Sequence, residues 1–221
     1  MPFDPLILGF DTSAAHCAAA LLSGDRVLAM RVEDMKSGQA ERLFPLLEEL
    51  LAEAGTAWGE LSGIGVGVGP GNFTGIRISV SAARGLALSL GIPAIGVSTL
   101  DAQALGVPGV VVSTVAAPRE QLYLQVIGGG ETAPPMLATL GDLPQLPARA
   151  EPACIGAQAA EVAARCAGTP RPPAHPLPEA IARIAARRLG RDLPPPAPLY
   201  IRGADAAPAR DAPPTILADD D

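Results

Sequence analysis

The sequence is poor in aromatic residues and in basic charge. Aromatic side chains make up only 3% of the 221 residues, so the core has to be built from Ala, Leu, Val and Ile. Lys36 is the only lysine, and the formal net charge is −7. Proteins that bind nucleic acid tightly usually neutralise phosphates with basic side chains. The composition therefore argues against a chain that grips tRNA or DNA by itself.

Cysteine and histidine are too few and too scattered for the usual metal or disulfide sites. The spacings of Cys17, Cys154 and Cys166 fit neither a disulfide framework nor a zinc site. His16 and His175 lie far apart, and no two histidines stand at helical spacing. A Gly-x-Ser-x-Gly nucleophile elbow is also absent. We therefore expect no bound metal, no cofactor and no Ser-His-Asp catalysis.

Long apolar runs are missing as well. No segment has the length of a membrane-spanning helix, and no basic region precedes the apolar stretch that Asp11 interrupts. These features predict a soluble, cytoplasmic protein with no membrane partner. Hydrophobic residues nevertheless make up 48% of the chain, which is enough for one large domain or two small lobes with a real core.

The first hundred residues divide clearly into strands and helices. Strands are predicted over residues 6–11, 17–22, 26–32, 63–68 and 94–97. Apolar residues recur at helical spacing over 39–54 and over about 74–90, where Gly91 and Pro93 then end the second helix. This order of elements predicts an α/β arrangement.

The second half is less regular. It opens with a hairpin-like pair of strands over 109–116 and 121–127. Beyond residue 130 lie 17 of the 24 prolines, so we expect long turn-rich stretches there, interrupted by helices near 157–166 and 179–190. The end of the chain, from about residue 203, is expected to be disordered.

One glycine-rich segment has the character of a ligand loop. It reads Gly69-Pro70-Gly71-Asn72-Phe73-Thr74-Gly75-Ile76-Arg77 and lies between a predicted strand and a predicted helix. Glycines let the backbone approach a ligand, and a helix N-terminus offers unpaired N–H groups to an anion. The segment is neither a Walker loop nor a dinucleotide fingerprint, because no Gly-Lys-Ser/Thr follows and Thr74 replaces the third glycine. A tight turn whose glycines only satisfy geometry explains it equally well.

A second polar segment follows the first predicted strand. Asp11, Thr12 and Ser13 place a carboxylate and two hydroxyls at the end of that strand. Such a turn can hold a phosphate or a hydrated metal ion. The same three residue types also form simple capping turns, and this alternative stays open.

Two helices have the character of interaction surfaces. On helix 39–54, Leu46 widens the apolar stripe beyond what one buried face needs. Helix 74–90 has almost no polar face, and Ser81, Gly85 and Ser89 would let another helix approach closely. One face would pack on the sheet and the other could meet a second chain, although complete burial in a larger core is the alternative. We predict a partner interface made of Leu43, Leu46, Leu47, Leu50, Ser81, Gly85, Leu88 and Ser89.

Together these segments resemble the TsaB (YeaZ) family. The likeness is carried by the 69–77 run and by Phe10-Asp11-Thr12-Ser13, Gly85-Leu86-Ala87, Ile95-Gly96-Val97-Ser98-Thr99-Leu100 and Pro198-Leu199-Tyr200-Ile201-Arg202. It is dense over residues 6–100 and sparse over 101–195. It implies an actin/Hsp70-like (ASKHA) α/β fold of two lobes, with mixed β-sheets flanked by helices. The first lobe would cover 1–100, a short, proline-rich second lobe 101–202, and a disordered acidic tail 203–221.

The resemblance also implies a function and partners. Proteins of this family are non-catalytic subunits needed for tRNA N6-threonylcarbamoyladenosine modification of the adenosine beside the anticodon. The chain would form a heterodimer with a TsaD-type catalytic subunit through helices 39–54 and 74–90. A TsaE-type ATPase would join the complex, and the chain would contact tRNA only as part of that complex. The chain alone would form a homodimer.

The chain departs from the family pattern at two places. The catalytic paralogue carries a His-x-x-x-His metal pair where this chain has Gln39 and Leu43, so the resemblance implies no metal. The hairpin has Ala116-Ala117-Pro118-Arg119 where the family typically shows Asp-Ala-Arg. We therefore predict a vestigial nucleotide-type loop made of Asp11, Thr12, Ser13, Gly69, Gly71, Asn72, Thr74, Gly75 and Arg77. The alternatives are an independent homodimeric module with a nucleotide-binding fold and a small ASKHA-type enzyme.

Overall fold

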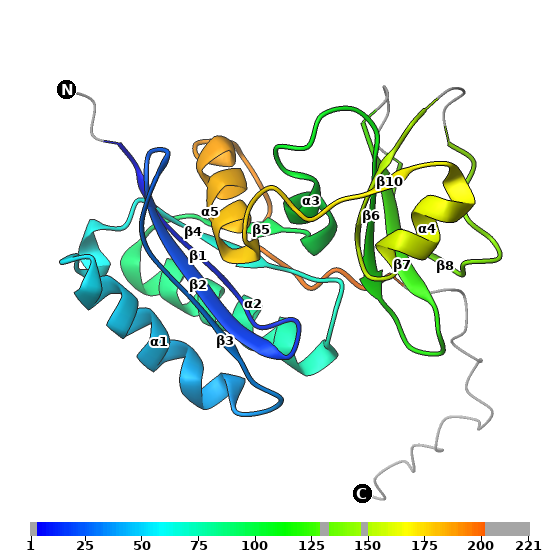
Figure 1. Cartoon of the computed structure of the whole chain (residues 1–221). Coiled ribbons are helices and arrows are strands. Elements are labelled where there is room, and N and C mark those ends of the chain that lie inside the picture. The colour runs from blue at the N-terminus through cyan, green and yellow to red at the C-terminus, as the bar shows by residue number, and fades with distance from the viewer. Residues whose placement is uncertain (1–3, 129–132, 147–149, 202–221) are drawn as a thin grey trace, which may run out of the picture.

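The computed structural model describes residues 4–128, 133–146 and 150–201 (Figure 1). Over these residues the chain forms two five-stranded sheets. We call each sheet with the helices packed on it a lobe. No helix in the described ranges is long and apolar enough to cross a membrane. The predicted tail over 203–221 lies outside the described residues.

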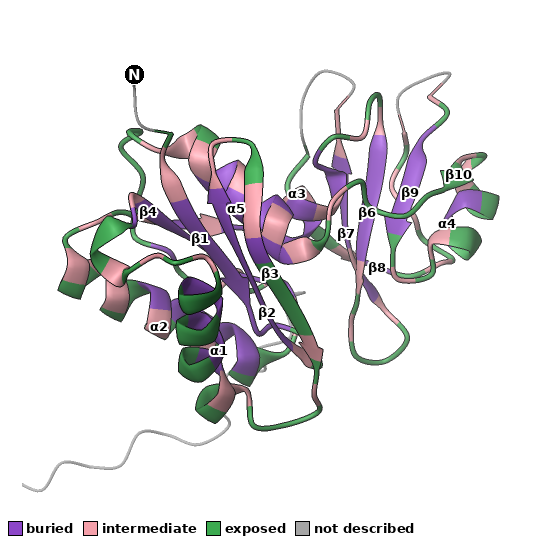
Figure 2. Ribbon diagram, turned by 60° about the vertical axis from the view of Figure 1, so that its left-hand side comes forward, coloured by how far each residue is buried: buried purple, intermediate pink, exposed green. Residues whose placement is uncertain are grey.

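The first sheet has the strand order β3-β2-β1-β4-β5. Its strands are β1 (Leu6–Asp11), β2 (His16–Ser23), β3 (Arg26–Asp34), β4 (Gly63–Gly67) and β5 (Ala94–Val97). The first three strands pair antiparallel, whereas β4 pairs parallel with both β1 and β5. The five strands predicted from periodicity and the mixed sheet are therefore confirmed. In Figure 2 the edge strand β3 is largely exposed, whereas the inner strands are buried.

Helices cover both faces of this sheet. On one face lie α1 (Gln39–Glu53), the short 3₁₀ turn η1 (Trp58–Glu60) and α2 (Phe73–Leu90), and on the other lies α5 (Leu177–Arg188). Successive residues of a strand point to opposite faces. Leu8 and Phe10 accordingly pack under α1 and α2, and Ile7 packs under α5. Gly9 lets α5 approach closely, because a Cβ there would lie 2.7 Å from the Cβ of Ala182.

The second sheet has the strand order β10-β9-β6-β7-β8. Its strands are β6 (Val111–Ala116), β7 (Leu122–Ile127), β8 (Met136–Ala138), β9 (Ala153–Gly156) and β10 (Thr169–Pro170). The predicted hairpin is β6 and β7, and α4 (Ala159–Cys166) and α5 are the two predicted late helices. Our prediction of only turns and helices after residue 130 was wrong for β8, β9 and β10. These strands are only two to four residues long, and pairing with β6 and β7 fixes them rather than local periodicity.

A small helix that we did not predict joins the lobes. It is α3 (Thr99–Ala104), which contacts both β6 and α5 (Figure 1). After α3 the chain forms the second sheet and then comes back to the first lobe. There α5 packs on β1, β2 and β4. Further along, the backbone N–H of Leu199 donates to the carbonyl of Val68 over 2.8 Å. We therefore propose a first lobe that includes α5 and the segment that follows it, in place of a division near residue 100.

Candidate functional site

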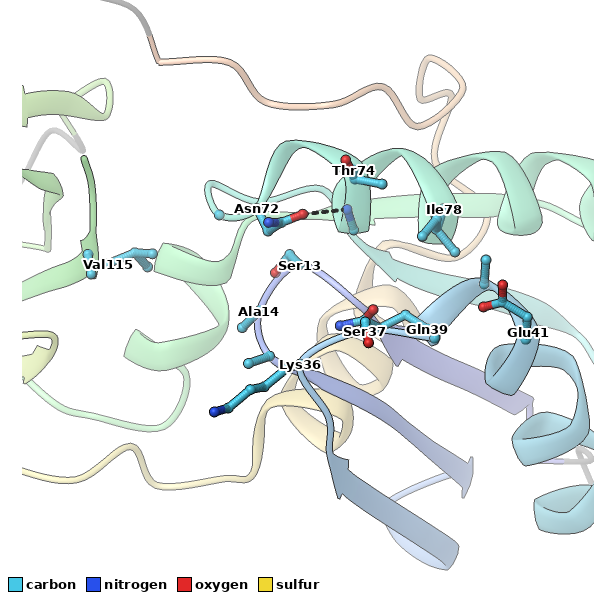
Figure 3. Close-up of a pocket in the computed structure, with 16 residues that line it drawn as sticks. Ser13, Ala14, Lys36, Ser37, Gln39, Glu41, Asn72, Thr74, Ile78 and Val115 are labelled. Carbon is cyan, nitrogen blue, oxygen red and sulfur yellow. Dashed lines mark hydrogen bonds between the residues drawn. The ribbon is translucent and has the colours of Figure 1, made fainter.

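A cleft of about 610 Å³ lies between the lobes (Figure 3). Its walls come from the turn after β1, the segment leading into α1, the start of α2 and the end of β6, and they include Ser13, Lys36, Gln39, Asn72, Thr74, Val115 and Ala116. In Figure 3, Val115 lies across the cleft from Ser13 and Asn72. The two polar segments singled out in the sequence thus meet at one site.

The turn after β1 uses most of its polar side-chain atoms within the chain, whereas the buried Asp11 Oδ2 has no hydrogen-bond partner among the described residues. The fully buried Asp11 carboxylate accepts hydrogen bonds through Oδ1 from the backbone N–H and the hydroxyl of Ser13, both over 2.9 Å. The hydroxyl of Thr12 donates to the carbonyl of Gly75 over 2.7 Å. Both hydroxyl protons are therefore used inside the chain. His16 Nε2 also lies 2.7 Å from Asp11 Oδ1. We did not predict that contact, which forms because β2 turns back antiparallel to β1 and places His16 near the end of β1.

The glycines at the start of α2 make room for that turn. A Cβ on Gly71 would overlap the carbonyl oxygen of Ser13, and one on Gly75 would overlap the carbonyl oxygen of Thr12. The space on the side where a Cβ of these two glycines would lie is thus filled by the chain's own backbone. This geometry favours the reading of the segment as a close-packed turn.

The N-terminus of α2 is also capped from within the chain. Asn72 is the N-cap, and its side-chain oxygen accepts from the backbone N–H of Gly75 over 2.9 Å (Figure 3). The backbone N–H of Asn72 donates to the carbonyl of Ser13 over 2.6 Å. One of the helix's free N–H groups therefore already has a partner.

Four residues of the predicted loop do not line the cleft: Asp11, Thr12, Gly69 and Arg77. Gly69 adopts a left-handed φ of 88° and accepts the backbone N–H of Thr99. The guanidinium of Arg77 stacks on the ring of Phe73, with 3.8 Å between its carbon and the ring centroid, and donates to the hydroxyl of Tyr200 over 2.9 Å. Because Tyr200 is 123 positions away in the sequence, no local pattern could have indicated this contact.

The cleft offers few ligands for a metal-bound nucleotide. Its lining contains one lysine, Lys36, and one carboxylate, that of Glu41, and Ala116 supplies only a methyl group from the second lobe. Magnesium in phosphate sites is held through carboxylates and phosphate oxygens. Within the described ranges no cluster of three or more His, Cys, Asp or Glu side chains could hold a metal ion.

A second hollow of about 590 Å³ lies between α1 and α2. Its lining is mostly apolar or small: Ala40, Leu43, Phe44, Ile78, Ser81, Ala82, Gly85, Leu86 and Ser89. Phe44 is 43% exposed, and a Cβ added to Gly85 would meet no atom within 4 Å. We call this hollow the α1/α2 groove.

The structure corrects half of our predicted interface. Leu43, Leu46, Leu47 and Leu50 are each 0% exposed and belong to the core beneath α1. Helix α1 lies against β2, β3 and α2 at once, so its wide apolar stripe is buried by its own chain. These leucines are therefore not surface contacts, although Leu43 forms part of the wall of the α1/α2 groove.

The predicted residues on α2 are on the surface. Ser81, Gly85, Leu88 and Ser89 are all exposed, and Leu88 is 87% exposed. Complete burial of α2, the alternative that we left open, does not occur in this chain. A further hollow of about 560 Å³, lined in part by Gly85, Leu88 and Leu193, continues the apolar face past the groove.

The protein thus has two lobes, and each is a mixed five-stranded sheet with helices. A cleft at the carboxyl ends of β1 and β4 separates them. These features define an α/β protein of the ASKHA class. The family model of TsaD, tRNA N6-adenosine threonylcarbamoyltransferase, matches residues 33–183. The chain is 38% identical over 94 residues to the tRNA threonylcarbamoyladenosine biosynthesis protein TsaB of Escherichia coli. The matched stretch covers 42% of this chain and 40% of that protein. The chain thus spans less than half of that curated relative. It belongs to the TsaB/YeaZ family.

Two longer matches agree with this assignment. An uncharacterized protein of Mycobacterium tuberculosis is 33% identical over 205 residues, covering 91% of this chain and 94% of that protein. The solved structure of YeaZ from Pseudomonas aeruginosa is 26% identical, with a TM-score of 0.71 over 89% of this chain and 100% of that one. The similarity to that structure therefore extends through both sheets.

Proposed function

We propose that the chain is a non-catalytic partner subunit in the formation of N6-threonylcarbamoyladenosine in tRNA, at the adenosine beside the anticodon. It acts by forming a heterodimer with a TsaD-type catalytic subunit. The reaction is suggested by the names of the matching family model and of the E. coli relative. The role within that reaction is suggested by the surfaces of this chain.

The observation that carries the proposal is the exposed apolar face of α2 beside the α1/α2 groove. Small residues at Ser81, Gly85 and Ser89 leave the helix backbone open, so a partner helix can approach to about 8 Å. Leu88 is 87% exposed, and burying a leucine side chain contributes about 1.5–3 kcal/mol. A contiguous exposed apolar face of this kind is typical of a protein–protein interface.

The interlobe cleft supports a role without catalysis. The hydroxyls of Thr12 and Ser13 donate within the chain, and the second lobe presents Ala116 to the cleft. Where the TsaD-type paralogue is expected to hold its metal, this chain has Gln39, which donates to the carbonyl of Met35 over 3.2 Å, and the buried Leu43. The two histidines expected in the paralogue's metal site are thus replaced by an amide and an alkyl side chain.

The charge of the chain supports an indirect contact with tRNA. A net charge of −7 disfavours binding of a polyanion. Basic surfaces of other subunits therefore bind the tRNA. A TsaE-type ATPase completes the proposed complex.

The test combines binding with reconstitution. The full chain is mixed with the TsaD-type protein of the same organism, and the molar mass is measured by sedimentation or light scattering. We expect a one-to-one complex. In a modification assay with all other components present, omission of this chain is expected to abolish product, and the chain alone is expected to make none. Full activity without the chain, or a homodimer that persists when the TsaD-type protein is in excess, would overturn the proposal.

A further inference from the structure

Two cysteines of the second lobe lie in contact. Cys154 is in β9 and Cys166 is the last residue of α4, and their sulfur atoms are 3.5 Å apart. Cys154 is 0% exposed, whereas Cys166 reaches the surface in part. The two residues are twelve positions apart, a spacing that predicts no pair, so only the tertiary structure brings them together.

The chain around the pair is built to hold this contact. Cys154 belongs to the core beneath α4 together with Val162, and Cys166 packs against that core. After α4, Ala167 adopts a left-handed φ of 53° and turns the chain back, so that β10 pairs with β9 beside Cys154. Gly168 completes the close fit, because a Cβ there would lie 3.0 Å from the sulfur of Cys154. Strand pairing and close packing therefore hold the backbone on both sides of this contact.

We propose that Cys154 and Cys166 form a reversible oxidation site, at which a peroxide converts the two thiols into a disulfide. A sulfur–sulfur bond is about 2.05 Å long, so the two atoms have to approach each other by only about 1.5 Å. This site lies in the second lobe, away from the α1/α2 groove, and does not depend on the function proposed above.

The difference in exposure sets the order of the two steps. Burial, and next the hydrogen bond with Cys166, raises the pKa of Cys154 to about 12, so this thiol is neutral near pH 7. The thiolate is the reactive form, so the more accessible Cys166 reacts first.

Each step balances. The Cys166 thiolate attacks one peroxide oxygen, the O–O bond breaks, hydroxide leaves, and a sulfenic acid forms. The Cys154 sulfur then attacks the Cys166 sulfur, the S–S bond forms, and the S–O bond breaks. The hydroxide that leaves takes up the proton of Cys154 and departs as water. Overall the two thiols lose two electrons and two protons, and hydrogen peroxide is reduced to two molecules of water.

The experiment counts thiols in the full chain before and after treatment with hydrogen peroxide. After quenching, the protein is unfolded with an alkylating reagent and its mass is measured. We expect untreated protein to carry three alkyl groups, one on each cysteine. Treated protein should carry one, on Cys17, and peptide mapping should find Cys154 joined to Cys166. Reduction with dithiothreitol should restore all three sites, and the oxidised protein should melt about 5 °C or more above the reduced protein.

Three variants separate this site from general oxidation. Cys17→Ser removes a buried thiol of the first lobe and should leave the disulfide unchanged. Cys154→Ser and Cys166→Ser should each abolish the cross-link, and Cys154→Ser should stop the reaction at oxidised Cys166. Over-oxidation of Cys166 without a cross-link in the wild type would overturn the proposal. A disulfide between two chains, or no loss of free thiols at all, would overturn it equally.

Discussion

Gly85 is an exposed position at which the outer face of α2 can be changed with little effect on the fold. It lies within the helix, is exposed, and has no atom within 4 Å of an added Cβ. Glycine is the poorest helix former apart from proline, so Gly85→Ala should stabilise the chain by up to about 1 kcal/mol. Gly85→Glu should also be neutral or slightly stabilising in the free chain. A loss of binding in either variant would therefore not come from unfolding.

The expected effect on the heterodimer runs in the opposite direction. A partner helix packed at about 8 Å leaves no room for a long side chain at Gly85, and a glutamate there would be buried without a partner charge. Together these effects cost several kcal/mol, and since 1.4 kcal/mol is a factor of ten, affinity should fall by about a hundredfold or more. The single methyl of Gly85→Ala should weaken binding by about tenfold or less.

The measurement pairs thermal unfolding with binding to the TsaD-type protein, by calorimetry or co-elution. Gly59→Glu is the matched control. Gly59 is also exposed, an added Cβ there would have no atom within 4 Å, and the residue does not line the α1/α2 groove. The control should fold and bind as the wild type does. A folded Gly85→Glu variant that binds normally would refute the placement of the interface on this face of α2. An equal loss in the Gly59→Glu variant would show that added negative charge, and not the groove, is responsible.

Three other predictions test the turn after β1, a surface ion pair and the cleft. Gly75→Ala places a Cβ against the carbonyl oxygen of Thr12 and should lower the free energy of unfolding by about 1–3 kcal/mol. An unchanged midpoint of thermal unfolding would contradict the close packing of the turn. The hydrogen bond from Arg42 holds the pKa of Glu33 below its ordinary value. The contribution of the Arg42–Glu33 pair to the free energy of unfolding is therefore fully present above about pH 4.3, and it is lost as the pH falls through the lowered pKa. Arg42→Gln should therefore lower the free energy of unfolding at pH 7 by more than it does in acid below the lowered pKa, and denaturant titrations that give equal losses under both conditions would refute this. The isolated chain should bind ATP weakly and not hydrolyse it, because Ala116 brings no carboxylate to the cleft, and a micromolar Kd by calorimetry would count against this.

The first lobe follows closely from local sequence. Its inner strands are buried on both faces and its helices have strong periodicity, so apolar runs and glycine stops locate them within a few residues. Gly91, for example, ends α2 in the left-handed conformation that only glycine adopts easily. The second sheet was much less predictable, because β8, β9 and β10 are very short and are fixed by pairing with distant strands.

The candidate site shows the same division. The motif 69–77 and the turn 11–13 could be singled out from residue types, and they do meet at one cleft. Residue types could not tell whether the glycines admit a ligand or a neighbouring backbone. The carbonyl oxygens of Thr12 and Ser13 lie where a Cβ of Gly75 or Gly71 would be, and they come from the turn after β1, more than fifty residues earlier in the sequence.

The interface prediction separates what periodicity can and cannot determine. Spacing along α1 and α2 determined that both helices carry wide apolar stripes, because every third or fourth residue faces the same way. Which stripe is covered depends on the surfaces that the rest of the chain brings against it. Only the tertiary structure decided that Leu46 and Leu50 of α1 are buried against the first sheet, whereas Gly85 and Leu88 of α2 stay exposed. The sequence by itself thus determined the family, the α/β class and the two helices on which we propose the interface, and the packing of distant segments decided which of their side chains are exposed.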